Sequence, residues 1–338
     1  MTEILGADAM GSASATRTPG QLESALEAHR RELTGYCYRM LGSAFEADDA
    51  VQETLLRAWR GIGGFKGDAS LRSWLYRIAT NVCLDMLDGR RRRARPMDLE
   101  RASVRPSGPG EPLPSDTWVE PIPDSSVVGQ GADPADLTVE RETIRLAFVA
   151  ALQHLPPRQR AVLILREVLR WKADEVAGLL DTSIASVNSA LQRARATMAA
   201  RHATDGDLFA PMDEQQQALL RRFVDAFERY DLDLLTSLLH EDAVQSMPPY
   251  SLWLRGPDEV RAWWLGPGIG CRGSRLLATA ANGTPAFGQY KPGDTPGTLE
   301  PWALHALDVV DDRIAAINTF LDTERLFPLF GLPPGLKV

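Results

Sequence analysis

Apolar and polar residues alternate with a helical period along the first third of the chain. One helix is indicated by apolar residues that recur every three or four positions and stop at Gly42, a residue type that often ends helices: Leu33, Tyr36, Cys37, Met40 and Leu41. Residues 44–59 show a second helical pattern, apolar on one side and largely acidic on the other. A third begins after Ser70, a good N-cap residue, and is followed by five arginines within residues 90–95. Residues 21–95 therefore predict an all-α domain.

A second all-α domain is predicted over residues 140–203. Residues 140–155 are amphipathic, and Pro156-Pro157 ends that helix and starts the next one. Two further helical patterns, 172–180 and 184–198, meet at the short turn Asp181-Thr182-Ser183. Two short helices joined by such a turn are typical of a helix-turn-helix.

The second helix of this pair has two distinct sides. Its apolar side consists of Ile184, Val187, Leu191, Ala194 and Met198. The opposite side carries serine, alanine, glutamine and arginine, which suits a helix that enters the DNA major groove, about 12 Å wide, and bonds to bases and phosphates. The alternative is an ordinary helical hairpin whose outer face is solvated.

The remaining segments divide into a linker, a third domain and two tails. Residues 96–139 contain eight prolines and no period, which predicts an acidic linker without regular structure. Its Trp118 is either packed locally or a docking point for another domain. Residues 213–327 mix helical and strand patterns and contain the hairpin turn Asn282-Gly283, which predicts an α+β domain with a curved sheet. Residues 1–20 predict a disordered tail, and residues 328–338 a C-terminal tail.

The distribution of charge is more informative than the net charge of −8. Residues 1–95 hold 14 Lys/Arg and 12 Asp/Glu (+2), and residues 140–203 hold 10 and 6 (+4). Residues 96–139 hold 2 and 8 (−6), and residues 204–338 hold 11 and 19 (−8). This asymmetry indicates that the two helical domains contact a polyanion and that the acidic segments do not.

Several classes of protein and site are not expected. The chain has no apolar run long enough to span a membrane and no signal-peptide pattern. Its three cysteines are far apart and lack metal-ligand spacing, so we expect no zinc site, no disulfide framework and no cofactor. A cytoplasmic protein without membrane contact fits these features.

Two stretches carry a family resemblance. The segment DDAVQETLLRAWRGIGGFKGDASLRSWLYRIATNVCLDMLDGRRRR resembles conserved region two of extracytoplasmic-function (ECF) sigma factors of the sigma-70 family. The segment LPPRQRAVLILREVLRWKADEVAGLLDTSIASVNSALQRAR resembles their region four. The resemblance implies a protein that binds bacterial core RNA polymerase and directs it to promoter DNA.

The resemblance also implies roles for residues at matching positions. The polymerase-binding candidates are Asp48, Asp49, Gln52, Glu53 and Arg57. The candidates for melting and reading the promoter −10 element are Phe65, Lys66, Arg72, Arg77, Asn81, Arg90 and Arg91. The −35 candidates are Ser186, Asn188, Ser189, Gln192, Arg193 and Arg195. The common family pattern has basic residues where this chain has Asn188 and Ala190, so we expect fewer phosphate contacts there.

The C-terminal part resembles a SnoaL-like cone, in which helices and a bent sheet surround a pocket. Residues 118–121 resemble a tryptophan–proline motif in the linkers of sigma factors that carry such a domain. The implied role is control of polymerase binding in cis, with a small molecule or a protein as regulator. Candidates for a regulatory pocket or docking site are Trp118, Tyr250, Trp253 and His305. We expect no enzyme; the alternative is a helix-turn-helix regulator fused to a ligand-binding or cyclase/isomerase-like domain.

Overall fold

A computed structural model describes residues 19–65, 70–129, 134–202 and 214–337, and the predicted N-terminal tail lies almost wholly outside these ranges. The first helical domain consists of α1 (Pro19–Glu27), α2 (Arg30–Leu41), α3 (Ala44–Gly61), η1 (Ile62–Gly64) and α4 (Leu71–Leu87). Gly42 ends α2 in the left-handed conformation (φ 73°), and its N–H donates to the carbonyl of Tyr38. The hydroxyls of Ser43 and Ser70 cap α3 and α4 by accepting backbone N–H groups. Local side chains thus fix where these helices begin and end.

The linker is packed, contrary to the expectation of a structureless segment. It contains α5 (Pro96–Leu99), η2 (Ser115–Thr117), α6 (Asp124–Val127) and the start of α7 (Pro134–Glu142). Trp118, Val119 and Ile122 are buried, and isolated β-bridges join Ala94 to Trp118 and Pro123 to Ala281. Its apolar residues are buried one by one against other segments. Their spacing in the sequence is therefore not regular, and no helix or strand pattern results.

The second helical domain follows as α8 (Leu146–Gln153), α9 (Pro157–Leu163), the π-helical turn η3 (Ile164–Val168), α10 (Ala173–Leu179) and α11 (Ile184–His202). Helices α10 and α11 form the predicted helix-turn-helix. Val187, Leu191 and Ala194 are buried as expected. Ile184 is 49% exposed, so its predicted burial is wrong; it is the first residue of α11, at the end of the buried stripe.

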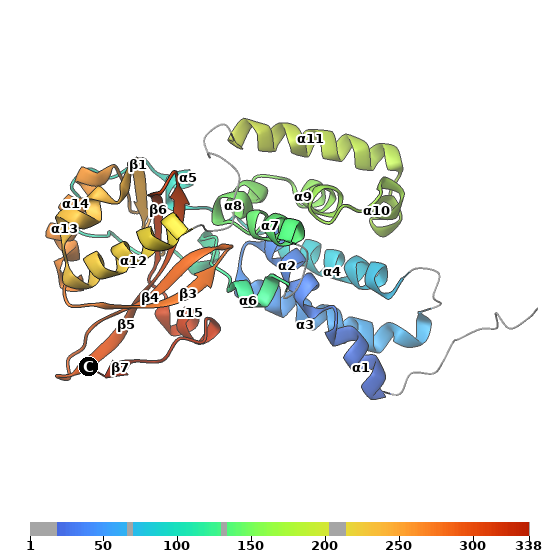
Figure 1. Ribbon diagram of the computed structural model, residues 1–338. Helices are drawn as coiled ribbons and strands as arrows, with labels where there is room; N and C mark the ends of the chain where they lie inside the picture. Colours follow the sequence, from blue (N-terminus) through green and yellow to red (C-terminus); the bar gives the residue numbers. More distant parts are fainter. Residues whose placement is uncertain (1–18, 66–69, 130–133, 203–213, 338) are drawn as a thin grey trace, which may run out of the picture.

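The C-terminal domain combines helices with one mixed sheet, as predicted (Figure 1). Its elements are α12 (Glu214–Arg229), α13 (Leu232–Ser237), β1 (Leu239–Ser246), β2 (Trp253–Arg255), α14 (Pro257–Leu265), η4 (Pro267–Cys271), β3 (Arg275–Ala281), β4 (Thr284–Pro292), β5 (Thr298–Val310), β6 (Arg313–Phe320), α15 (Thr323–Leu329) and β7 (Leu336–Lys337). The strand order is β2-β1-β6-β5-β4-β3, with β7 on β5; β1 and β6 are parallel. The expected C-terminal tail is thus part of the fold, because β7 extends the sheet and Leu332 is buried.

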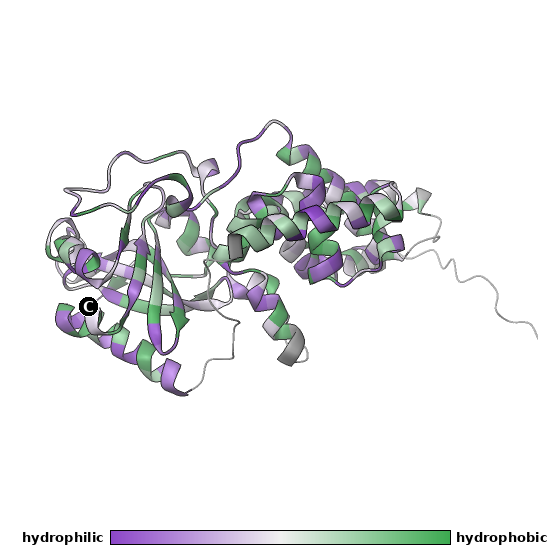
Figure 2. Ribbon diagram, turned by 90° about the horizontal axis from the view of Figure 1, so that it is seen from above, coloured by the Kyte–Doolittle hydropathy of each residue, from purple (hydrophilic) through white to green (hydrophobic). Residues whose placement is uncertain are grey.

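Two apolar cores hold the molecule together. One lies between the sheet and the helices α12 to α14 and includes Phe223, Phe287 and Leu307. The other runs without a break through both helical domains and the linker to the opposite face of the sheet, where it includes Tyr290 and Leu304. The C-terminal domain therefore lies directly beside the helices (Figures 1 and 2), and apolar burial stabilises that arrangement.

Candidate functional site

The acidic candidates on α3 share its solvent-facing side. Asp48, Asp49, Gln52 and Arg57 are exposed, and Glu53 is half-buried. Arg57 forms an ion pair with Glu53 (2.6 Å), and the amide of Gln52 donates to Asp48 (2.8 Å). Asp48 forms a longer ion pair with Arg30, at 3.8 Å.

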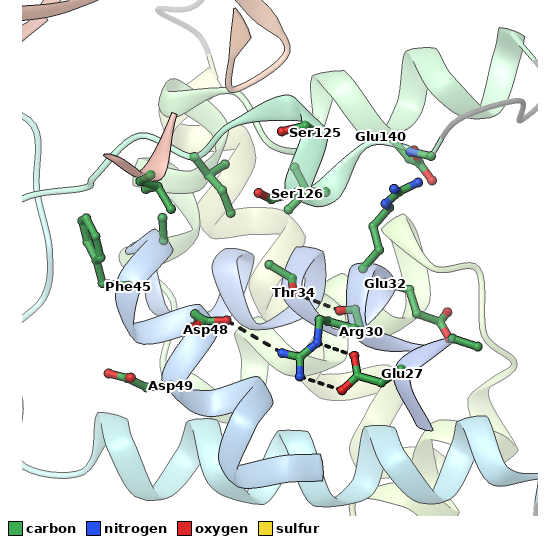
Figure 3. A pocket seen from close by; sticks show the side chains of 17 residues that line it. Glu27, Arg30, Glu32, Thr34, Phe45, Asp48, Asp49, Ser125, Ser126 and Glu140 are labelled. Atoms are coloured by element: carbon green, nitrogen blue, oxygen red, sulfur yellow. Dashed lines mark hydrogen bonds and ion pairs between the residues drawn. The ribbon is translucent and has the colours of Figure 1, made fainter. Parts of the chain in front are cut away.

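A cleft of about 800 Å³ opens beside these carboxylates (Figure 3). One wall comes from α1, α2 and α3, and the other from α6, α7 and Leu329 of α15. Arg30 forms two hydrogen bonds with Glu27 (2.6 and 2.8 Å), which lowers the pKa of the Glu27 carboxyl. The cleft therefore brings the first helical domain, the linker and the C-terminal helix to one place.

The −10 candidates on α4 and just before it lie in two different environments. The ring of Phe65 packs against Trp74, with 5.1 Å between centroids, and Asn81 is exposed. Arg72 is held by Glu32 (2.7 Å) and lies over the ring of Trp171, which belongs to the second helical domain. Arg77 donates a hydrogen bond to the carbonyl of Gly178 on α10. Lys66 lies outside the described residues.

The arginine run after α4 is only partly available to a ligand. Arg90 pairs with Glu46, and Arg91 is exposed. Arg93 is buried; it pairs with Glu46 at 2.9 Å and donates to the carbonyl of Trp118 at 2.6 Å. Part of the run thus fixes the linker to the first helical domain.

The outer face of α11 is open to solvent. Each of its six candidates is exposed: Ser186, Asn188, Ser189, Gln192, Arg193 and Arg195. Ser183 caps the helix by accepting the N–H of Ser186 at 3.1 Å. Arg193 donates to Ser189 and Arg195 pairs with Glu167, both at 2.5 Å. These surface contacts are weak, so they leave both guanidinium groups free to rotate toward a phosphate.

Trp118 belongs to the linker, and two of the other regulatory candidates contact the linker. Trp118 is buried where the linker pairs with Ala94. The indole of Trp253 donates to the carbonyl of Glu100 at 3.0 Å, and Tyr250 forms a β-bridge with Pro112. Tyr250 and Trp253, candidates for a regulatory pocket or docking site, lie at the edge of the sheet against the linker.

His305 lies inside the C-terminal domain. Its Nε2 donates to Gln289 (2.8 Å) and its Nδ1 accepts from Thr319 (3.1 Å); Gln289 in turn donates to Ser274 (2.8 Å). Burial lowers the pKa of His305 to about 4, so the imidazole is neutral near pH 7. Asp308 is engaged with Arg145, the residue before α8 (2.8 Å), so it is not the acid–base partner of His305.

The β3–β4 turn joins all parts of the chain. The Asn282 side chain is fully buried; it donates to the hydroxyl of Tyr38 and to the carbonyl of Ile144, each at 2.6 Å. It also accepts the N–H of Ile122 at 3.0 Å. Sequence reasoning identified the Asn-Gly turn but missed this role, since nothing in the local sequence distinguishes a buried turn from an exposed one.

Buried guanidinium groups join the two helical domains. Arg39 of α2 donates to the carbonyl and hydroxyl of Thr143 (3.1 and 2.7 Å). Arg160 of α9 donates to the carbonyl of Met40 and to Gln153 (2.6 Å). Burial lowers the pKa of each arginine to about 10, so both stay charged at neutral pH. Separating the helical domains would remove these contacts.

Comparison with known proteins matches each of the three domains to a protein family. Residues 25–93 match Sigma-70 region 2, residues 145–198 match Sigma-70 region 4, and residues 220–317 match the SnoaL-like domain. The chain is 46% identical over 334 residues to the ECF RNA polymerase sigma factor SigG of Mycobacterium tuberculosis, covering 98% of this chain and 89% of that relative. The chain belongs to the ECF sigma factors.

A second relative of this ECF sigma factor is similar in both sequence and fold. It is 29% identical over 307 residues to SigJ of M. tuberculosis, covering 87% of this chain and 89% of SigJ. The crystal structure of SigJ has the same fold, with a TM-score of 0.60 over 92% of this chain and all of that one, at 24% identity. The alternative of a helix-turn-helix regulator fused to an enzyme is not favoured. Among the described residues, no helix is both long and apolar enough to cross a membrane.

Proposed function

We propose that this sigma factor binds core RNA polymerase through the exposed side of α3 and recognises promoter DNA with α4 and α11. The polymerase-binding residues would be Asp48, Asp49, Gln52, Glu53 and Arg57. Their position on the solvent-facing side of the helix carries this proposal, because exposed acidic groups such as Asp48 and Asp49 suit a basic protein partner. The cleft beside them extends the same surface toward the linker.

The −10 element would be melted and read at the face of α4. The residues proposed are Phe65, Lys66, Arg72, Arg77, Asn81, Arg90 and Arg91. Cationic groups attract the phosphates, and aromatic stacking with an unpaired base stabilises it by about 1–3 kcal/mol, which favours strand opening. The exposed arginine and amide side chains on this face support the assignment.

The −35 element would be read by α11 in the major groove. The residues proposed are Ser186, Asn188, Ser189, Gln192, Arg193 and Arg195. The exposure of all six residues and the small side chains at the start of the helix support this role. Because Asn188 and Ala190 are uncharged, affinity here depends mainly on Arg193 and Arg195.

The C-terminal domain would regulate the sigma factor in cis. It contacts region two through Asn282–Tyr38, region four through Arg145–Asp308, and the linker through Arg325–Glu120 (3.0 Å). These contacts hold the two DNA-binding regions in one arrangement. A small molecule or protein that binds the open and closed arrangements with different affinity would shift the balance between them.

The C-terminal domain would act without catalysis, in the cytoplasm and without a cofactor. The hydrogen-bond partners of His305 are neutral, Gln289 and Thr319. An acid–base catalyst needs a pKa near the working pH, and burial moves the pKa of His305 away from it.

Reconstitution tests the proposal. The purified chain is mixed with bacterial core polymerase, and runoff transcription is measured on fragments of its own genome. We expect a stable holoenzyme and transcripts with defined start sites. Loss of the holoenzyme on Asp48→Arg with Asp49→Arg, but not on the exposed control Asp174→Arg, would localise polymerase binding to α3.

A further inference from the structure

The cleft beside α3 is lined by apolar side chains as well as by carboxylates. The apolar side chains come from α3, the linker, α6 and α15: Ala44, Phe45, Ile122, Val127 and Leu329. The guanidinium of Arg325 on α15 lies over the ring of Phe45, 3.9 Å from its centroid, and also pairs with Glu120 at 3.0 Å. These contacts hold α15 beside α3, so that apolar side chains of both helices line the same cleft.

The charged side chains that line the cleft are mainly acidic. Five carboxylates and two guanidinium groups contribute, a net charge of −3: Glu27, Glu32, Asp48, Asp49, Glu140, Arg30 and Arg31. Arg30 lies between Glu27 and Asp48 and pairs with both, so its charge is compensated within the cleft (Figure 3). Asp48 and Asp49 are exposed and adjacent in α3. The cleft therefore attracts a cation and repels an anion.

The size and the lining of the cleft define the class of ligand. Its volume of about 800 Å³ is typical of a small-molecule site. Within the part of the chain that the structure describes, no group of three or more His, Cys, Asp or Glu side chains could hold a metal ion. An organic cation, unlike a bare metal ion, also buries its carbon chain against the apolar side chains. The lining thus suits an ammonium or guanidinium group on an apolar body.

We propose that this cleft binds a small amphipathic organic cation. The carbon chain of the ligand lies against Phe45, Val127 and Leu329, and its cationic group pairs with the carboxylates of Asp48 and Asp49. These two carboxylates are also proposed to bind core polymerase, so an occupied cleft excludes polymerase. That consequence rests on the proposed function, whereas the binding site rests on the cleft alone.

Isothermal titration calorimetry of the full-length chain tests the site, with decamethylenediamine as the probe. This diamine carries two ammonium groups on an apolar chain; decanoate, which has a chain of similar length and a negative head group, is the ligand control. Asp48→Asn with Asp49→Asn removes two charges from the cleft. Asp311→Asn with Asp312→Asn removes an equal charge from the exposed β5–β6 turn, which does not line the cleft. Ala28→Trp places a large side chain in the cleft.

We expect the wild-type chain to bind decamethylenediamine and not decanoate. Asp48→Asn with Asp49→Asn should weaken the affinity roughly tenfold, because two exposed ion pairs with the ligand are lost. The chain with Asp311→Asn and Asp312→Asn should bind like wild type, and Ala28→Trp should abolish binding. Any of three results would overturn the proposal: no binding of the diamine to wild type, equal losses from the two double substitutions, or wild-type affinity in Ala28→Trp. Decanoate binding as tight as that of the diamine would overturn the preference for a cation.

A second measurement separates the site from its consequence for polymerase. Core polymerase is added to the wild-type chain with and without saturating decamethylenediamine, and the holoenzyme is quantified by size-exclusion chromatography. We expect less holoenzyme with the diamine, and no effect of the diamine on Ala28→Trp, whose cleft is filled. Equal amounts of wild-type holoenzyme in both conditions would overturn the exclusion of polymerase. If no holoenzyme formed even without the diamine, the proposed function would fail, while calorimetry would still decide the site.

Discussion

The side-chain amide of Asn282, at the tip of the β3–β4 hairpin, donates a hydrogen bond to the hydroxyl of Tyr38 over 2.6 Å. The two residues are far apart in the chain, one in the SnoaL-like domain and the other in region two. The Tyr38 hydroxyl passes the connection on by donating to the carbonyl of Glu120 in the linker at 2.8 Å. A single buried turn thus links the C-terminal domain to region two and to the linker of this sigma factor.

Removing the side chain of Asn282 should weaken that link. Asn282→Gly keeps the left-handed turn (φ 56°) but loses the hydrogen bonds to Tyr38, Ile122 and Ile144. Leaving buried partners unsatisfied costs about 1–3 kcal/mol, so the free energy of unfolding should fall by that order. Urea denaturation measures it. Tyr38→Phe should lower the free energy of unfolding by a smaller amount. If the urea midpoint of Asn282→Gly equalled that of wild type, the contact would not form.

The Arg145–Asp308 ion pair should stabilise the contact between region four and the sheet modestly. Its side chains are 20% and 25% exposed, so we expect Arg145→Met to lower the free energy of unfolding by about 1 kcal/mol. Exchanging the charges, Arg145→Asp with Asp308→Arg, should recover part of the loss. The measurement is a double-mutant cycle by chemical denaturation. A coupling energy of zero would show that this ion pair does not stabilise the contact between region four and the sheet.

Burial of His305 should make the stability of the C-terminal domain depend on pH. Its pKa falls from the ordinary 6.5 to about 4 in the folded state, because desolvation disfavours the charged imidazole. Below pH 6.5 the unfolded chain therefore binds more protons than the folded one, and stability falls as the pH decreases from about 6.5 to 4. The expected loss between pH 7 and pH 5 is about 2 kcal/mol.

The control for this pH effect is His305→Gln, which cannot titrate. Its free energy of unfolding should vary less with pH over the same interval, measured by urea denaturation at each pH. Equal slopes for wild type and His305→Gln would mean that another group is responsible.

Adding a cation at the uncharged position of the −35 helix should strengthen DNA binding. Asn188 is exposed at a position where the family commonly has a basic residue, so Asn188→Arg should add about one phosphate contact. The duplex affinity should rise several-fold, and its logarithmic salt dependence should steepen by about one. Ala200→Arg, exposed near the end of the same helix, controls for net charge alone. An equal gain from both substitutions would argue against a groove contact at Asn188.

The sequence predicted those parts of the fold that depend on local periodicity. The helix-turn-helix follows from the spacing of Val187, Leu191 and Ala194, and the end of α2 follows from Gly42. The packed linker was missed because Trp118 and Ile122 are buried by distant segments, which a local pattern does not report. The role of Asn282 was missed for the same reason.

The candidate site was predicted unevenly. Exposure of the −35 candidates follows from the helical wheel, and the structure places them together. The engagement of Arg72 with Trp171 could not be predicted, because it depends on how two separately folded blocks pack. The contacts of Tyr250 and Trp253 with the linker could not be predicted either, because they join segments far apart in the sequence.

The most direct test of the central claim is runoff transcription by core polymerase with the wild-type chain and with Asn282→Gly at equal, limiting concentrations. The account predicts transcripts from the same start sites with both proteins, and more transcript with Asn282→Gly because the C-terminal domain then holds regions two and four less tightly. The absence of specific transcripts with either protein would contradict the assignment of function. Equal amounts from both would contradict control by the C-terminal domain.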